Sequence, residues 1–118
     1  MPTIKCIDIP NSNLNIEFVI GKNARENFEI IDDAEEHHMW FHIEGQSSGH
    51  IIAKIDEDLD KKTLRYIVKQ GAVLCKQVSK YARLKNINIV YARIRDVEKT
   101  DTIRMVHVSN PKNVAIRK

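Results

Sequence analysis

The chain has 118 residues, of which 42% are apolar and 30% charged. This composition excludes a disordered polypeptide, and the length suits one domain over residues 1–118. No apolar run approaches the roughly 18 residues of a membrane-spanning helix, and the first ten residues lack the features of a secretory signal, so we expect no membrane partner. The formal net charge is +3, and the two cysteines form no CxxC pair. We therefore expect no disulfide framework and a reducing compartment, cytoplasmic or nuclear.

The first predicted elements are a strand and a short helix. Apolar residues alternate with polar ones up to Gly21, which predicts a half-buried strand over 15–20 that ends in a turn. Asn23 is a good N-cap for a helix over about 24–31, and Glu26, three residues later, is the expected partner in a capping box.

Two further apolar runs, 39–44 and 50–55, are joined by GQSSG and predict a β-hairpin. Alternation along the first strand places Met39, Phe41 and Ile43 on one face. If that face is buried, Trp40 and His42 point outward or into a groove. The alternative, that Trp40 is an ordinary core residue, is equally open.

The longest periodic segment predicts an amphipathic helix over about 63–83, with Thr63 as its N-cap. Its apolar sector contains Leu64, Ile67, Val68, Gly71, Leu74, Cys75, Val78 and Ala82, and the opposite sector contains Lys62, Arg65, Lys69, Lys76, Lys80 and Arg83. Strands are predicted over 87–94, 104–108 and 113–117, with a turn at Asn110-Pro111. The expected fold is α+β, a mixed and mostly antiparallel sheet with the long helix packed on one face.

Charge is segregated along the chain. Residues 26–60 contain eleven acidic residues and a single base, Lys54, whereas residues 61–95 contain ten bases and no acid. Solvent-exposed helices commonly place acidic and basic side chains at i,i+4 spacing. By contrast, every charged residue of the long helix over 63–83 is basic. A surface of this kind can follow a phosphate backbone, so this segregation favours a polyanionic partner, with Lys85, Arg93 and Arg95 extending the basic face.

The five histidines allow enzymatic alternatives. A zinc site would need three or four converging ligands, but the sequence has no HExxH or CxxC motif, so we predict neither a metal site nor a cofactor. A metal-free ribonuclease with His42 and His50 as acid and base is chemically possible, because imidazole titrates near neutrality. A protein-interaction module that uses the charge-segregated surfaces is a third interpretation. We favour a binding protein without catalytic residues.

Three segments resemble the NFACT-R domain, the RNA-binding module of the NFACT proteins of ribosome quality control. The family pattern combines G-[RK]-[ND]-x-x-[EQ]-N, D-[IL]-W-F-H and S-x-H. It is met here by Gly21, Lys22, Asn23, Glu26, Asn27, Trp40, Phe41, His42, Ser48 and His50. His38 stands where the family has an acid, and TDTIRMVHV replaces the family's Pro-Gly turn before the last strands.

The resemblance implies an RNA-binding module, with tRNA or ribosomal RNA as partner, DNA as an alternative, and a link to the ribosome and translation. It adds Lys22, Arg25, Trp40, His42 and His50 to the contact residues expected from the basic face. The full set of predicted contacts is Lys22, Arg25, Trp40, His42, His50, Arg65, Lys69, Lys76, Lys80, Arg83, Lys85, Arg93 and Arg95.

Overall fold

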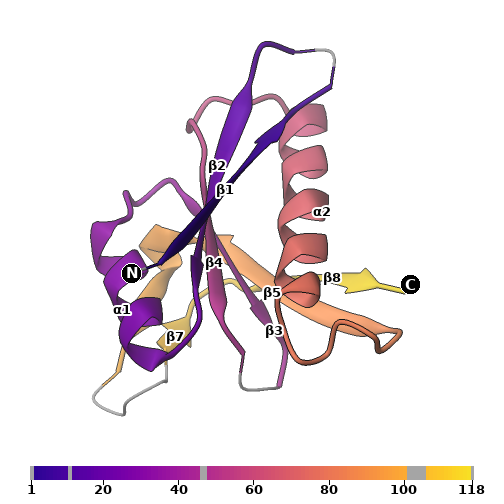
Figure 1. Ribbon diagram of the computed structural model, residues 1–118. Coiled ribbons are helices and arrows are strands. Elements are labelled where there is room, and N and C mark those ends of the chain that lie inside the picture. The colour runs from indigo at the N-terminus through magenta and orange to yellow at the C-terminus, as the bar shows by residue number, and fades with distance from the viewer. Residues whose placement is uncertain (1, 11, 46–47, 101–105, 118) are drawn as a thin grey trace.

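The computed structural model describes residues 2–10, 12–45, 48–100 and 106–117 (Figure 1). Over these residues the elements are β1 (Thr3–Asp8), β2 (Asn15–Gly21), α1 (Ala24–Asp33), β3 (Met39–Ile43), β4 (His50–Lys54), α2 (Lys61–Gln77), β5 (Ile87–Arg93), a short 3-10 turn (Ile94–Asp96), β6 (Val97–Lys99), β7 (Val106–Val108) and β8 (Lys112–Ile116).

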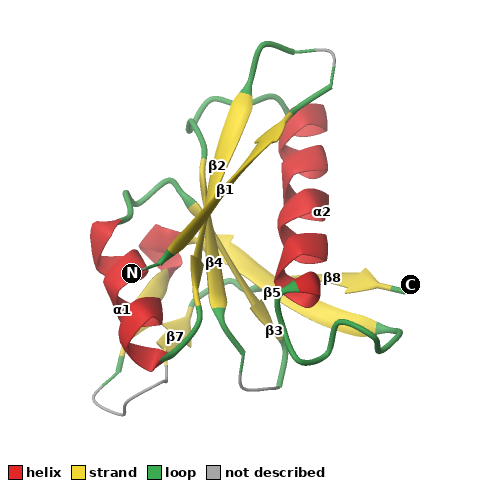
Figure 2. Cartoon of the chain, in the orientation of Figure 1, coloured by secondary structure: helices red, strands yellow, loops and turns green. Residues whose placement is uncertain are grey.

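The main sheet has six strands in the order β1-β2-β4-β3-β5-β8, and neighbouring strands are antiparallel (Figure 2). The predicted hairpin β3–β4 lies at its centre. Helices α1 and α2 lie on opposite sides of this sheet (Figure 1), and β6 and β7 form a separate small ribbon. The structure confirms the predicted α+β class and the packing of the long helix on one face.

Alternation along the central strands separates two hydrophobic cores. Phe41 and Ile43 of β3 pack in the larger core with Ile67 of α2. Trp40, which points to the other face, packs with Ile30 of α1 and Val97 of β6. Trp40 is only 2% exposed, so the structure supports the second of the two interpretations for this side chain, a core position.

The passage from β2 into α1 follows the sequence prediction closely. Helix α1 begins after Asn23, whose side chain accepts the N–H of Glu26 at 2.9 Å. The Glu26 carboxylate accepts the N–H of Lys22 at 3.0 Å, one residue before the position of a standard capping box. These two bonds fix the angle at which the chain passes from β2 into α1.

The predicted bounds of the long helix are wrong at both ends. Its N-cap is Asp60, whose carboxylate accepts the N–H of Thr63 at 3.3 Å, so Thr63 lies inside the first turn. The helix ends at Gln77, because Ser79 donates from both its hydroxyl and its backbone N–H to the carbonyl of Lys76. Neither described helix is long and apolar enough to cross a membrane.

The early end of α2 changes the environment of five residues of the predicted helix. Val78 and Ala82, predicted to be buried, are exposed. Lys80 and Arg83 lie beyond the helix, so they do not continue its basic row. Lys76, predicted to face outward, is 7% exposed and donates from Nζ to the carbonyl of Ala82 at 2.8 Å. The exposed row of α2 is therefore limited to its first three turns.

The C-terminal strands agree with the predictions to within one or two residues where they are described. Strand β5 ends at Arg93, β8 covers Lys112–Ile116, and β7 covers Val106–Val108, while Arg104 and Met105 of the predicted strand lie outside the described residues. Asn110 has a positive φ of 50°, as a turn there requires. Strands β1 and β6 were not predicted. Strand β1 is an edge strand whose side chains are mostly exposed, so they show no alternation between buried and exposed positions.

Gly71 tests the packing of α2 on the sheet. A β-carbon at Gly71 would approach the Phe41 ring more closely than real side-chain contacts do, and Phe41 is fully buried. We expect Gly71→Ala to lower the free energy of unfolding by about 1–2 kcal/mol, since overpacking outweighs the helix propensity that alanine adds. Urea unfolding measures this. Gln70→Ala, at a partly exposed position next to it, is the control and should change stability by less than about 0.5 kcal/mol. A Gly71→Ala protein as stable as the control would contradict the packing.

Candidate nucleic-acid interface

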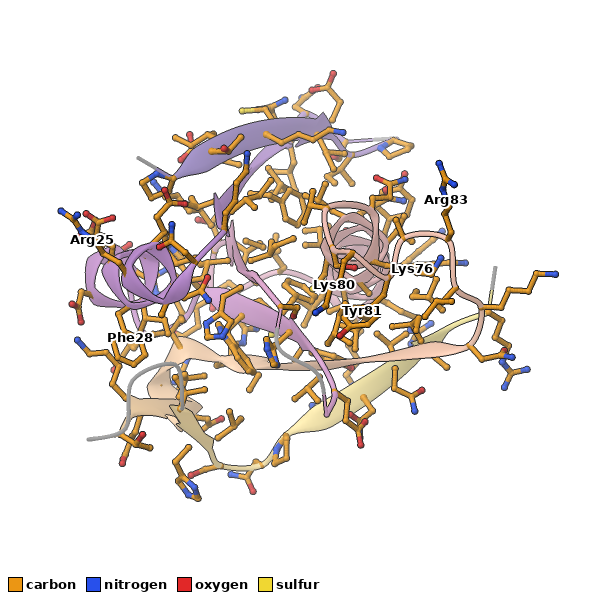
Figure 3. All side chains as sticks on the ribbon, turned by 60° about the horizontal axis from the view of Figure 1, so that its bottom comes forward. Arg25, Phe28, Lys76, Lys80, Tyr81 and Arg83 are labelled. Carbon is orange, nitrogen blue, oxygen red and sulfur yellow. The ribbon has the colours of Figure 1, made fainter. Side chains whose placement is uncertain are left out.

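A pocket of about 520 Å³ lies at one end of the main sheet. We call it the sheet-end pocket. It is formed where β2 and β3 end and β4 begins, between the N-terminus of α1 and the segment after α2. It is lined by Lys22, Asn23, Ala24, Asn27, His42, Ser48, Gly49, His50, Val78, Ser79 and Lys80. Figure 3 brings this end of the molecule forward, with Arg25 on α1 and Lys80 next to the end of α2.

Asn27 joins α1 to the sheet at the back of the pocket. Its side-chain Oδ1 accepts the backbone N–H of His50, the first residue of β4, at 2.9 Å. A β-carbon at Gly21 would lie 2.5 Å from that same oxygen, and one at Gly49 would collide with the carbonyl of Gly21. The two glycines are therefore needed for the close approach of the three chain segments. This contact explains why Gly21 and Asn27 occur together in the motif.

Two histidines of neighbouring strands form the floor of the pocket. The rings of His42 and His50 are 4.8 Å apart and nearly perpendicular, and Trp40 stacks on His42 at 5.7 Å and meets His50 edge-on at 5.2 Å. His50 is only 3% exposed. Among the described residues, His50 Nδ1 and Trp40 Nε1 are the buried side-chain atoms without a hydrogen-bond partner. Such atoms are uncommon in folded proteins and each one calls for an explanation.

Burial keeps both imidazoles of the floor neutral. Burial lowers the pKa of His42, and burial together with the nearby His42 lowers the pKa of His50 to about 3. At neutral pH both rings can therefore accept or donate a hydrogen bond, but neither carries a charge. The floor of the pocket is polar and neutral.

Two lysines contribute positive charge beside this floor. Lys22 and Lys80 line the pocket and are exposed. Arg25 is exposed on the first turn of α1, and Arg83 and Lys85 are exposed on the segment that follows α2. Four of the predicted contact residues, Lys22, His42, His50 and Lys80, are thus brought together around one pocket.

The remaining predicted contacts lie elsewhere. Arg65 and Lys69 are exposed on α2. Arg95 is ion-paired with Glu57 at 2.7 Å, and Arg93 is partly buried and donates to the carbonyl of His37. Together with the burial of Lys76, these contacts show that the basic face predicted from α2 and the end of β5 is not a continuous surface of free cations.

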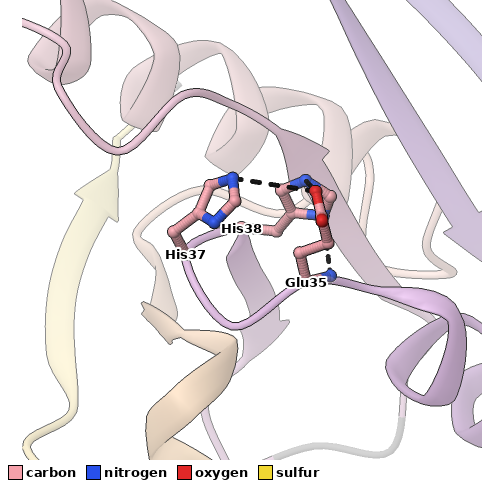
Figure 4. A group of neighbouring side chains, drawn as sticks. All are labelled: Glu35, His37 and His38. Carbon is pink, nitrogen blue, oxygen red and sulfur yellow. Dashed lines mark hydrogen bonds and ion pairs between the residues drawn. The ribbon is translucent and has the colours of Figure 1, made fainter.

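One group of potential metal ligands occurs among the residues that the structure describes. The ligand atoms of Glu35, His37 and His38 lie within 4.8 Å of one another at the start of β3 (Figure 4). However, Nδ1 of His38 accepts the backbone N–H of Glu35 at 3.2 Å. The neutral tautomer therefore holds its proton on Nε2, whereas a metal-binding histidine usually donates from its other nitrogen. We interpret the group as a hydrogen-bonded turn between α1 and β3.

Sequence reasoning missed part of the pocket lining, chiefly Asn27, Gly49 and Ser79. Asn27 and Gly21 were available from the motif, where the spacing N-x-x-E-N fixes one turn of helix. Ser79 had no usable signal, because the predicted helix continued past it. Lys80 was predicted as a contact, but on the face of α2 and not beside the pocket.

The fold is that of an α+β domain, and the sequence comparison gives its family. The family described as NFACT protein RNA binding domain matches residues 10–107. The chain belongs to this family of RNA-binding domains. No curated protein matches the chain in sequence.

The fold is also similar to a solved structure from Streptococcus suis, described as the C-terminal of the fibronectin/fibrinogen-binding protein. The TM-score is 0.73 at 17% sequence identity, so this likeness concerns the fold alone. The match covers 86% of the present chain and 41% of that structure. The chain therefore spans less than half of the solved chain to which its fold is similar.

The buried imidazole of His50 makes stability depend on pH. Its pKa of about 3 in the folded state is below the ordinary value of about 6.5, so the unfolded chain binds the proton first as pH falls. The stability that neutral His50 contributes is fully present above about pH 6.5 and is lost as pH falls toward 3, with a slope of about 1.4 kcal/mol per pH unit.

We expect His50→Gln to remove most of this slope between pH 6 and 4, measured by urea unfolding at half-unit intervals. Carboxylates titrate in both proteins and cancel in the comparison. Parallel curves for wild type and variant would contradict the burial of a neutral imidazole at this position.

Proposed function

We propose that this RNA-binding domain contacts RNA at the sheet-end pocket and its cationic surroundings. The observation that carries the proposal is convergence: motif residues from three separate segments, Lys22 and Asn27, His42, and Ser48 and His50, line one pocket. The pocket also contains Lys80, which is not part of the motif. A binding site explains this shared location better than three independent structural roles.

Electrostatics support the same surface. Lys22 and Arg25 lie at the start of α1, where the helix dipole also favours negative charge. Lys80 lines the pocket from the segment after α2, and Arg83 is exposed three residues further along the same segment. RNA phosphates that contact both groups of cations would release their condensed counterions into solution. The affinity would therefore decrease as the salt concentration rises.

The RNA partner that we propose is tRNA or ribosomal RNA, because the NFACT proteins act in ribosome quality control. A role close to the ribosome and to translation in the cytoplasm follows from the same resemblance. A preference for RNA over DNA is part of the proposal, and a labelled DNA duplex tests it.

The ribonuclease alternative is disfavoured by the state of its two histidines. General acid–base cleavage needs one protonated and one neutral imidazole near neutral pH. Burial lowers the pKa of both His42 and His50, which disfavours the protonated partner that this mechanism needs. We therefore expect labelled RNA to remain intact after incubation with the protein in EDTA.

Three double charge reversals locate the contact surface. Lys22→Glu with Lys80→Glu changes the pocket, Arg65→Glu with Lys69→Glu changes the outer face of α2, and Lys5→Glu with Lys112→Glu changes two exposed lysines on the outer strands. Each substitution changes the charge by two, so each pair lowers the formal net charge from +3 to −1. The comparison therefore holds overall charge constant.

Fluorescence anisotropy of labelled tRNA at two salt concentrations should show the largest loss for the pocket pair, about tenfold or more, with a salt slope smaller by about one for each lost phosphate contact. The outer-strand pair measures the general charge effect. A larger loss for the α2 pair would move the contact surface to Arg65 and Lys69. Equal losses for all three pairs would contradict a localised site, and no binding of RNA by wild type would favour a protein-interaction module.

A further inference from the structure

We propose that the sheet-end pocket holds one unpaired nucleotide of the RNA, with its phosphate between Lys22, Lys80 and the first turn of α1 and its base against His42 and His50. This inference rests on the proposed RNA-binding surface and specifies what that surface recognises. It divides the pocket into an anionic subsite at the rim and a neutral subsite at the floor.

The rim of the pocket suits a phosphate group. The backbone N–H groups of the first turn of a helix have no acceptors within the helix, and Ala24, the first residue of α1, lines the pocket. Lys22 and Lys80 add two positive charges from opposite sides. The carboxylate of Glu26 is turned to the N–H of Lys22 and is not part of the lining.

The floor of the pocket also contains a buried polar atom without a hydrogen-bond partner. His50 lines the pocket although it is only 3% exposed, and its Nδ1 has no partner among the described residues. A buried polar nitrogen without a partner costs free energy, which a hydrogen bond from a ligand would recover. The perpendicular His42 ring at 4.8 Å and the Trp40 ring at 5.2 Å hold the imidazole of His50 in place.

The chemistry of the floor suits a base and not a second phosphate. Both imidazoles are neutral at pH 7 because burial lowers the pKa of each ring. Neutral rings can hydrogen-bond to the edge of a base and stack on its face, but they add no charge to bind an anion. The volume of about 520 Å³ is also in the range of pockets that hold small organic ligands, and it far exceeds the space that a phosphate alone needs.

A nucleotide that enters this pocket must be unpaired. A base in a duplex is stacked on both faces and its edge is paired, so it reaches a protein pocket only after extrusion from the helix. Loops, bulges and single-stranded ends offer such bases without this cost. The pocket therefore predicts a preference for RNA with unpaired nucleotides.

Trp40 provides a direct test, because it is the single tryptophan of the chain and its ring contacts both histidines. The wild-type protein is titrated with each of the four nucleoside 5′-monophosphates and, separately, with inorganic phosphate, and Trp40 fluorescence is recorded. We expect a saturable change with at least one nucleotide and none with phosphate at the same concentration. Lys22→Glu should weaken the nucleotide response by about tenfold, a loss of one phosphate contact, and Lys5→Glu should leave it unchanged.

A second measurement uses RNA itself. His42→Ala should weaken binding of a single-stranded 12-mer by about tenfold, the loss of one base contact, and should leave the affinity for a blunt RNA duplex unchanged. Equal losses for both RNAs would overturn the inference.

A fluorescence response that is equal for phosphate and nucleotides, or absent for all of them, would also overturn it. If RNA binding still depends on Lys22 and Lys80 in that case, the proposed function stands and only the nucleotide pocket fails. If RNA binding does not depend on these lysines, both proposals fail.

Discussion

The hydrogen bond from the His50 N–H to the Asn27 side chain determines how the domain is put together at its motif end. It joins the first helix to the start of a central strand across 23 residues of sequence. The bond can form only because Gly21 and Gly49 have no side chains where the three segments meet. This contact fixes the position of the α1 N-terminus relative to the start of β4, and the sheet-end pocket lies beside it.

The sheet separates two environments, and the candidate site lies where they meet. On the α2 face, Phe41 and its neighbours form a closed apolar core. On the α1 face, Trp40 continues the core, but His42 and His50 follow it toward the end of the sheet, where the packing opens into the pocket. The same alternation that builds two cores thus places two neutral imidazoles beside the cations of Lys22 and Lys80. A polar floor with a cationic rim is the combination that a nucleotide requires.

Local signals predicted β2, α1 and the β3–β4 hairpin well. The alternation of β2, the Asn23 cap and the hairpin depend on neighbours in sequence, and each was confirmed. The end of α2 was wrong because apolar periodicity continues at Val78 and Ala82, whereas hydrogen bonds of Ser79 stop the helix. The burial of Lys76 and the pairing of Arg95 with Glu57 depend on contacts between distant segments. A charge pattern could therefore predict a polyanion-binding protein, but it could not predict which cations remain available.

Chemical-shift mapping locates the RNA contact that we propose at the end of the sheet. Amide spectra of the isotopically labelled protein, recorded during titration with tRNA, report every backbone position at once. We expect the largest shifts in the four segments that line the pocket, which are Lys22 to Asn27, His42, Ser48 to His50 and Val78 to Lys80. Shifts confined to the outer face of α2, around Arg65 and Lys69, with the pocket segments unchanged, would contradict this location.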